Sequence, residues 1–480
     1  MNITYRFLLG VAVSLLFAGG WSGDLVAQNR YDALRYSLKY PGQDPSSLAL
    51  PGASASSYQG SGSYIFNPAT MALNQNSIFN GGLDIRRVAE TVDYRGTTSE
   101  PSDQQIGISH FNFTYSFPTS RGSFIIGGGY HQLADFNRTS AANVYNPASS
   151  ITDQFNNDDF YYDLAFNTYA VDYVDTTQQN TVPFVRLAGF DGIQQDVTIT
   201  ERGKLGEWSA YVATEFQENL FIGASIGLPS GSYDYERTFL ETDTREFYEL
   251  RDMLSEDKIS ADISGFIARV GLAYKLNELL QFGVSYTFQS TLDIQEEYTS
   301  SISTEFDTPD DEGNYTYSDE LDGNVDYEIT RPSRAIAGFT VTPGDKISIS
   351  GTAEFVDYTS IDMDQLNTRI EIDEKRLIEE EFESVINLMG GIEYSFSPAF
   401  SIQGGYGLYP SPRADFDAGR QFISGGLSYG LWSDSRFNLG VQYGTWNDRL
   451  NLYDSPYTSG EPMQQEVKRL RIMAGASFGF

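Results

Sequence analysis

From about residue 77 to the C-terminus, apolar side chains occupy every second position in one segment after another. The pattern is clearest in residues 266–274, 280–288, 386–396, 437–443 and 467–480. A period of two is that of a β-strand with one apolar and one polar face, because successive side chains of a strand point to opposite sides. Its repetition along most of the chain indicates one large antiparallel sheet.

The connections between these segments alternate strictly between short and long. Counting the segments gives about fourteen strands, an even number, as in single-chain bacterial outer-membrane barrels. We expect them to begin near residues 77, 105, 122, 207, 219, 263, 278, 332, 345, 384, 399, 420, 435 and 467. The long connections fall at 89–104, 133–206, 231–262, 292–331, 358–383, 408–419 and 447–466. The sequence therefore predicts an all-β fold, a transmembrane antiparallel β-barrel over residues 77–480 with long extracellular loops. A soluble sandwich would explain the strands but not this alternation.

The N-terminus and the composition place this barrel in an outer membrane. A mean hydropathy of -0.33 with 40% hydrophobic residues argues against a bundle of apolar helices. Residues 1–27 have the basic residue, short apolar core and small residue of a secretory signal peptide. The last strand ends in Phe480 and resembles those of bacterial outer-membrane barrels, whose assembly machinery reads such an ending. We expect the cell outer membrane of a Gram-negative-type bacterium, with the barrel assembly machinery, membrane lipid and lipopolysaccharide as partners.

Charge and cysteine content exclude several classes of function. The net charge of -34 argues against nucleic acid as a partner. Many acids lie in the expected loop residues 307–326, which are either a solvated loop or a site where divalent cations bridge to lipopolysaccharide. There is no cysteine, no metal-ligating cluster and no pattern linking the two histidines, His110 and His131, to a nucleophile. We therefore expect no enzyme activity, no metal and no cofactor.

Residues 28–76 do not follow the strand pattern and precede the first strand. They are rich in Ser, Ala, Gly and Pro, and a barrel of fourteen strands encloses space that wall side chains fill poorly. We interpret this segment as a hatch that plugs the lumen. It contains an Asn-Pro-Ala-Thr-Met-Ala element at 67–72, preceded by an Ala/Gly/Ser-rich stretch. In this element and in its layout the chain resembles the FadL/TodX family of outer-membrane transporters for long-chain fatty acids and other hydrophobic compounds.

The resemblance implies a fourteen-strand barrel with a hatch, and passive uptake of hydrophobic small molecules. Cargo would rest between extracellular loops, enter a pocket in the lumen and leave sideways through a kink in the third strand. Gly127, Gly128 and Gly129 of the expected third strand could form this lateral gate, or only make room for packing. A change of parity in the second strand predicts a bulge near Ser109 and His110. The family is usually monomeric.

Other residues are candidates for the latch and for ligand binding. Asn67, followed by Pro68 and Ala69, could hold the hatch closed, or merely initiate a turn. Arg269 and Arg471 should face the lumen and could bind a carboxylate, or pair with Glu354 or Glu393. Phe247 lies in residues 243–254, whose apolar spacing predicts a loop helix that could offer an apolar groove. A general diffusion porin and a structural or adhesive barrel remain alternatives to transport, although neither needs a hatch.

Overall fold

The computed structural model describes residues 29–174, 180–187, 189–432, 434–457 and 462–480. The expected signal peptide, 1–27, lies outside the described residues. The strands form one antiparallel sheet that closes on itself, because the first strand pairs with the last over sixteen residue pairs from Ile78 and Gly479 to Asp93 and Gln464. The expected all-β barrel with fourteen strand positions in its wall is confirmed.

Ten of the fourteen positions are single strands and four consist of two segments each. In wall order they are β1 (Ile78–Tyr94), β3 (Ser102–Phe117), β4 (Phe124–Asp135) with β5 (Arg138–Asn146), β8 (Ile193–Gln217), β9 (Leu220–Thr242), β10 (Leu250–Gly265) with β11 (Ile267–Lys275), β12 (Leu280–Thr287) with β13 (Ser290–Phe306), β14 (Thr316–Arg331) with β15 (Arg334–Val341), β16 (Ile347–Asp357), β18 (Ser384–Ser397), β19 (Phe400–Tyr409), β20 (Arg420–Trp432), β21 (Ser435–Leu450) and β22 (Met463–Gly479).

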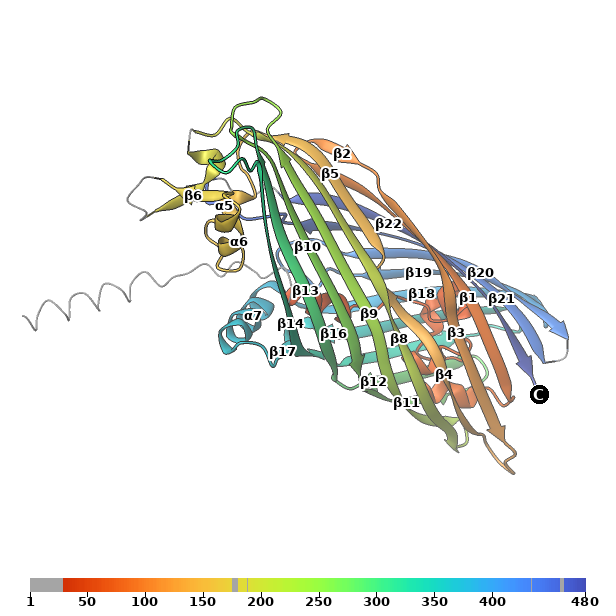
Figure 1. Ribbon diagram of the computed structural model, residues 1–480. Coiled ribbons are helices and arrows are strands. Elements are labelled where there is room, and N and C mark those ends of the chain that lie inside the picture. Colours follow the sequence, from red (N-terminus) through yellow and green to blue (C-terminus); the bar gives the residue numbers. More distant parts are fainter. Residues whose placement is uncertain (1–28, 175–179, 188, 433, 458–461) are drawn as a thin grey trace, which may run out of the picture.

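Smaller elements lie in the connections at the long-loop end. They are β2 (Thr97–Ser99), α5 (Thr152–Phe155), α6 (Tyr162–Asn167), β6 (Val171–Tyr173), β7 (Thr181–Pro183), η3 (Phe184–Arg186), η4 (Tyr358–Ser360), β17 (Asp362–Asp364) and α7 (Thr368–Glu381). In Figure 1 the group of α5, α6 and β6 projects at the top of the barrel, and α7 lies at its side.

Several strands are longer than predicted, so parts of the expected loops are wall. β8 begins at Ile193 rather than near 207, and most of β10, most of β13 and all of β14 occupy residues expected to be loop. The reason is that the alternation is inverted there. Along β10, Ala261 and Ile263 are buried inside, whereas Ser260 and Asp262 face outward. The outer face of this half suits water, so the pattern of outward-facing apolar residues that marks the other strands is absent there.

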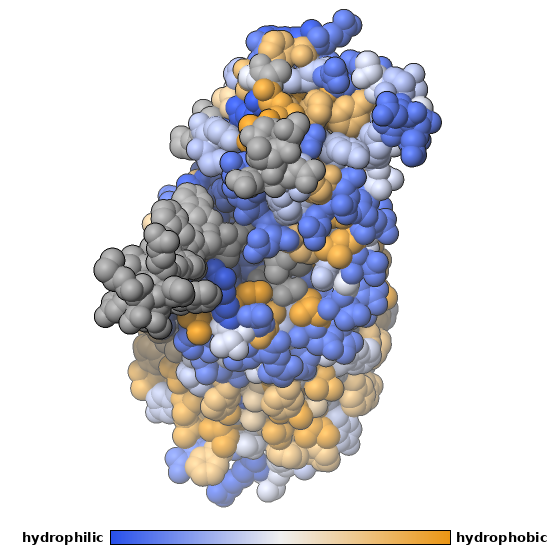
Figure 2. Space-filling view, turned by 60° about the vertical axis from the view of Figure 1, so that its left-hand side comes forward, coloured by the Kyte–Doolittle hydropathy of each residue, from blue (hydrophilic) through white to orange (hydrophobic). Residues whose placement is uncertain are grey.

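The other half of the wall carries an apolar belt on its outer face. Large side chains such as Phe113, Val212, Ile226 and Phe282 are exposed there, as lipid contact requires. Figure 2 shows orange, hydrophobic surface concentrated in the lower part of the molecule and mostly blue surface above it. None of the described helices is long and apolar enough to cross a membrane.

The segment before β1 lies inside the barrel (Figure 1). It contains α2 (Arg30–Ser37), α3 (Pro45–Ala49), η1 (Pro51–Ala53), α4 (Ser63–Phe66) and η2 (Pro68–Leu73). We call residues 29–73 the hatch. Its first helix, α2, reaches α7 of the long-loop end, where Arg30 Nε lies 2.8 Å from Glu381 Oε2. The hatch therefore spans the lumen from the middle of the barrel to its outer rim.

Two apolar cores fill the half of the barrel above the belt. One joins the segment between β5 and β8, including Phe155 and Tyr161, to the inner faces of β8, β9 and β10. The other packs Leu34 and Tyr36 of α2 under Ile378 of α7. Burial of these side chains holds the long connections against the wall, since apolar area removed from water is the main stabilising contribution.

Candidate functional site

The hatch lies on a series of glycines on the inner face of the wall. A Cβ on Gly271 would collide with Asn67 of the hatch, and one on Gly283 with the Ala55 carbonyl. The same close approach to hatch residues is made on further strands by Gly223, Gly338, Gly391, Gly405, Gly426, Gly440 and Gly475. A side chain at these positions would push the hatch away from the wall. The wall from β9 round to β22 thus determines where the hatch sits.

Asn67 connects the hatch to itself and to this wall. Its side chain is fully buried, and Nδ2 donates to the carbonyl oxygens of Ala55, at 2.6 Å, and of Leu272 in β11, at 3.1 Å. Its Oδ1 accepts the N–H of Ala69 at 3.1 Å and so caps η2. Pro68 favours the extended backbone that Asn67 adopts, with φ −145° and ψ 104°. The geometry supports a latch, whose role in gating stays a prediction.

Across the lumen, the hatch touches the wall through a pair of histidines. Tyr64 Oη lies 3.0 Å from His131 Nδ1, and the His131 ring stacks on His110 with centroids 5.5 Å apart. Ser61 of the hatch is 3.4 Å from His131 Nε2. Both histidines are buried. No sequence pattern assigned a role to this pair, although each histidine faces inward on its strand and the two are directly paired in the β3–β4 hairpin.

Above this histidine pair the ladder between β3 and β4 ends. Their pairing runs from Phe117–Phe124 to His110–His131; beyond it the described pairs join β3 to β1 and β4 to β8. We call the stretch between residues 102–109 and 132–135 the β3–β4 interruption. It lies at the apolar belt, since Ile106 is 68% exposed on its edge. The expected bulge is confirmed, because the register between β1 and β3 shifts opposite Ser109.

The three glycines proposed as a gate lie below this interruption. Gly127, Gly128 and Gly129 are in the part of β4 that pairs on both sides, with β3 and with β8. They let the backbones approach closely: a Cβ on Gly128 would be 2.6 Å from the Ser209 carbonyl oxygen. The three glycines therefore lie in the fully paired part of β4 next to the interruption, and they do not border the interruption itself.

Ion pairs cross the lumen behind the interruption. Arg86 of β1 bonds Asp135 at the end of β4 at 2.8 Å. Asp84 accepts from Arg471 Nε at 2.9 Å, and Arg471 also donates to the Gly42 carbonyl of the hatch at 2.8 Å. Arg471, proposed as a carboxylate anchor, thus has Asp84 as its partner rather than Glu354 or Glu393.

Arg269, the other proposed anchor, makes a bidentate pair with Glu207. Both bonds are 2.7 Å long and both side chains are buried. Glu354 instead lies near Arg334, at 3.3 Å, and near Lys39 of the hatch, at 3.9 Å. Burial lowers the pKa of Lys39 to about 7, while the Glu354 carboxylate acts in the opposite direction. The sequence identified the inward-facing arginines but not which strands their carboxylate partners occupy.

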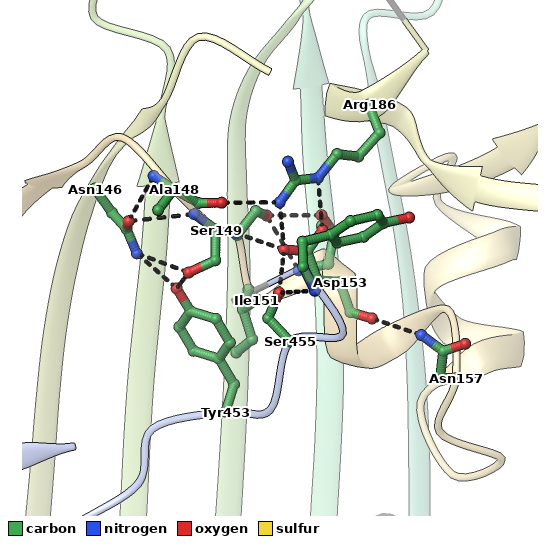
Figure 3. Close-up of polar contacts among 12 residues, drawn as sticks. Asn146, Ala148, Ser149, Ile151, Asp153, Asn157, Arg186, Tyr453 and Ser455 are labelled. Atoms are coloured by element: carbon green, nitrogen blue, oxygen red, sulfur yellow. Dashed lines mark hydrogen bonds and ion pairs between the residues drawn. The ribbon is translucent and has the colours of Figure 1, made fainter. Parts of the chain in front are cut away.

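The long-loop end is closed by a polar network above the first apolar core (Figure 3). Asp153 of α5 bonds Arg186 Nη2 at 2.6 Å and accepts from Ser455 Oγ at 2.9 Å. Asn146 Nδ2 donates to Tyr453 Oη at 2.8 Å. Figure 3 shows these side chains pointing toward one another from segments far apart in the chain. The connections before β8 and β22 thus form one cover.

The expected loop helix at 243–254 is wrong. Asp243 Oδ2 accepts the N–H groups of Phe247 and Tyr248, Glu246 has a positive φ of 56°, and β10 begins at Leu250. This tight turn takes the place of a helix, because the Asp243 side chain satisfies the N–H groups locally. Phe247 is 48% exposed and contacts Tyr248, so the proposed groove around it does not form as a helix face.

A polar cavity of about 770 Å³ lies beneath the hatch at the short-turn end. Its hatch side includes Asp44, Ser46 and Ser61, and His110 lies on its wall. Most of the other lining residues are polar, including Asn80, Glu393, Gln403, Asn438 and Ser477, and a smaller number are apolar, such as Leu431 and Trp432. A cavity with so many polar groups is less favourable than lipid for an apolar molecule.

A closed antiparallel barrel of fourteen strand positions with an internal N-terminal hatch is the architecture of plugged outer-membrane channels. Similar solved structures include the Pseudomonas putida toluene transporter TodX, at 15% identity and TM-score 0.56, with 92% of this chain and 99% of that chain covered. A Pseudomonas aeruginosa FadL homologue is 11% identical with a TM-score of 0.58, covering 92% and 100%. The Ralstonia pickettii toluene transporter TbuX is 13% identical with a TM-score of 0.54, covering 91% and 98%.

These similarities bear on the fold. The expected resemblance to the FadL/TodX family is confirmed for the architecture, over 92% of the chain. No protein-family model and no curated sequence matches the chain.

Proposed function

We propose that this protein takes up hydrophobic compounds, long-chain fatty acids or other lipophiles, passively across the outer membrane of a Gram-negative-type bacterium. The observation that carries the proposal is that the lumen is plugged while the ladder of the wall is interrupted at the level of the apolar belt. A plug prevents free flow of water, and an interrupted ladder at lipid depth provides a place where cargo can pass sideways. The TodX, TbuX and FadL-homologue structures share this fold, which supports the same class of cargo.

The route we propose ends at the β3–β4 interruption. Cargo reaching the lumen from the long-loop end would meet the hatch, and below it the polar cavity at the short-turn end. Entry into that cavity would expose apolar area at about 25 cal/mol per Å², whereas exit to lipid keeps it covered. The free energy of transfer therefore favours lateral exit, and the protein needs no energy source.

Opening of this route requires the hatch to move. Asn67 and Tyr64 hold it on two sides of the lumen, through β11 and through the histidine pair. We propose Asn67, Pro68 and Ala69 as the latch, and Gly127, Gly128 and Gly129 as the part of β4 that permits its upper end to separate from β3.

An uptake assay tests this function. Cells that produce the protein should accumulate a labelled long-chain fatty acid or labelled toluene faster than cells without it, at equal amounts of folded barrel in the outer membrane. Equal uptake of both compounds in the two strains would refute the proposal. Single-channel recording separates the alternatives, because a diffusion porin would give large stable conductance and an adhesive barrel would give neither conductance nor uptake.

We also propose a monomer that is inserted by the barrel assembly machinery and surrounded by lipopolysaccharide. The acidic surface of the long-loop end, for example Asp310, Asp311 and Glu312, is exposed, as solvated loops or cation bridges would both require. Mass determination in detergent tests the oligomeric state.

A further inference from the structure

The wall has a second interruption, three to five strand positions beyond β4. Phe266 separates β10 from β11, Phe288 and Gln289 separate β12 from β13, and Pro332 and Ser333 separate β14 from β15. The gaps lie side by side, because the pairs Thr287–Arg334 and Ser290–Arg331 flank the last two of them. We call this line the wall break. In Figure 1, β10 and β13 continue upward from it and β11 and β12 downward.

Two prolines prevent the ladder from closing at the wall break. The pairing of β9 with β10 ends at Ser230–Ser264 and resumes with β11 at Gly227–Ile267, so that Pro229 lies opposite Gly265. Pro229 and Pro332 have no backbone N–H to donate. Unpaired backbone groups are unfavourable in hydrocarbon, so such a break is tolerated only where polar groups can reach it.

A cavity of about 760 Å³ opens on the outer face at this break. Its apolar part consists of Trp208, Leu228 and Phe266, each more than half exposed. The polar part of its lining is Ser230, Ser264, Gln289, Ser290, Thr291 and Asp293. Below it the outer face is apolar and above it polar, so the cavity lies where hydrocarbon meets the aqueous side. We call it the outer-wall cavity.

Behind this cavity is a buried arginine with an unsatisfied group. Arg331 Nε donates to Ser290 Oγ at 3.0 Å, and Ser290 lines the cavity. Arg331 is 9% exposed, its Nη2 is buried without a hydrogen-bond partner, and no carboxylate of the described residues lies within 4.0 Å of it. The neighbouring Arg269 and Arg334, by contrast, have carboxylate partners. A buried guanidinium nitrogen without an acceptor is unfavourable, and an anionic group beside Nη2 would relieve this.

We propose that the outer-wall cavity binds a single-chain anionic amphiphile. Its tail lies against Leu228, Phe266 and the surrounding lipid, and its carboxylate enters the wall break beside Ser290 and accepts from Arg331. Asp293 faces water at the rim, where its charge is screened. The inference rests on the proposed function in one respect, that the bound amphiphile is also the transported compound. Binding at the cavity itself can be measured without uptake.

Photolabelling of the purified protein in phosphatidylcholine vesicles tests the site. Phosphatidylcholine carries no net charge, so no anionic lipid competes with the probe for Arg331. The probes are a long-chain fatty acid with a diazirine in its tail and the alcohol of the same length. The acid should label peptides containing Leu228 and Phe266 at concentrations about tenfold lower than the alcohol does, since a charge-assisted hydrogen bond is available to the acid alone.

Two variants and one matched control decide the outcome. Arg331→Gln, which can keep the bond to Ser290, should remove the preference for the acid and leave labelling by the alcohol unchanged. Leu228→Trp should reduce labelling by both probes by filling the outer face. Arg420→Gln is the control, because Arg420 is equally buried at 9% exposure on the other side of the barrel.

Equal labelling by acid and alcohol in the parent protein would overturn the inference. So would an equal loss of preference in Arg331→Gln and Arg420→Gln. A preserved acid preference in a protein that takes up no lipophile would refute the proposed function while leaving this site in place.

Discussion

At the scale of single residues, the Asn67 side chain bonds the hatch both to itself and to the wall. Asn67→Ala removes three hydrogen bonds and leaves the Leu272 carbonyl without its hatch donor. We expect docking of the hatch to weaken by about 2 to 3 kcal/mol, because buried polar groups lose their partners. The expected result is brief conductance events in planar bilayers and altered uptake of labelled fatty acid.

Asn76→Ala serves as the control for the latch, since Asn76 is exposed and only its backbone N–H and carbonyl bond to the side chain of Asn74, so that the substitution leaves these bonds in place. If Asn67→Ala matches this control in both conductance and uptake, Asn67 is a turn residue without a role in gating.

Gly128 carries a second residue-scale prediction. Its outward Cβ would lie 2.6 Å from the Ser209 carbonyl oxygen, so Gly128→Val forces β4 away from β8 below the interruption. We expect a folded barrel with uptake of labelled fatty acid reduced several-fold, measured at equal surface abundance. Ile126→Val, two residues away on the same face, should leave uptake unchanged. Normal uptake by Gly128→Val would exclude the three glycines from the route.

At the scale of elements, the β3–β4 interruption predicts that fixing the two strands together blocks exit. A Cβ on Gly107 would lie 3.9 Å from Gln132 Oε1, so cysteines at these two positions can be joined by a short bifunctional thiol reagent. The chain has no native cysteine, so the reagent finds only these sites. Cross-linking should abolish most uptake, and the uptake should be normal before cross-linking.

The matched pair for this experiment is Phe117→Cys with Phe124→Cys. These residues face each other on the same two strands, in the part that is already paired. Uptake that survives both cross-links equally would place the exit elsewhere in the wall.

The strands could be predicted from the sequence wherever their outer face contacts lipid. The alternation in 386–396 and 437–443 gave strands whose starts agree with β18 and β21, because lipid selects an apolar outer face. In β10 the same rule failed, because the outer face is polar there and the apolar residues are inside. The helix expected at 243–254 failed for a different reason, since one carboxylate, that of Asp243, satisfied the backbone locally.

At the scale of the whole molecule, the number of strands and the layout followed from connection lengths, but long-range partners did not. Nothing in the local sequence of Arg269 identifies Glu207 as its partner, because the pairing depends on how the barrel closes. The two wall interruptions were likewise beyond the pattern, apart from the bulge at Ser109. The alternation of apolar and polar residues predicts which side of the wall a side chain faces. It does not predict the level along the barrel at which the hydrogen bonds between neighbouring strands end.

The last prediction concerns the hatch as a seal. α2 supplies Leu34 and Tyr36 to the core beneath α7, and the middle of the hatch lies against nine wall glycines. We therefore expect that removal of the hatch opens a path from the polar cavity to the α7 side of the rim. We expect a variant lacking residues 29–73 to give large stepwise conductance in planar bilayers, whereas the full chain should give none that is stable. Stable large channels from the full chain would favour a diffusion porin, and a silent deletion variant would show that the cover containing Asp153 and Tyr453 seals the barrel without the hatch.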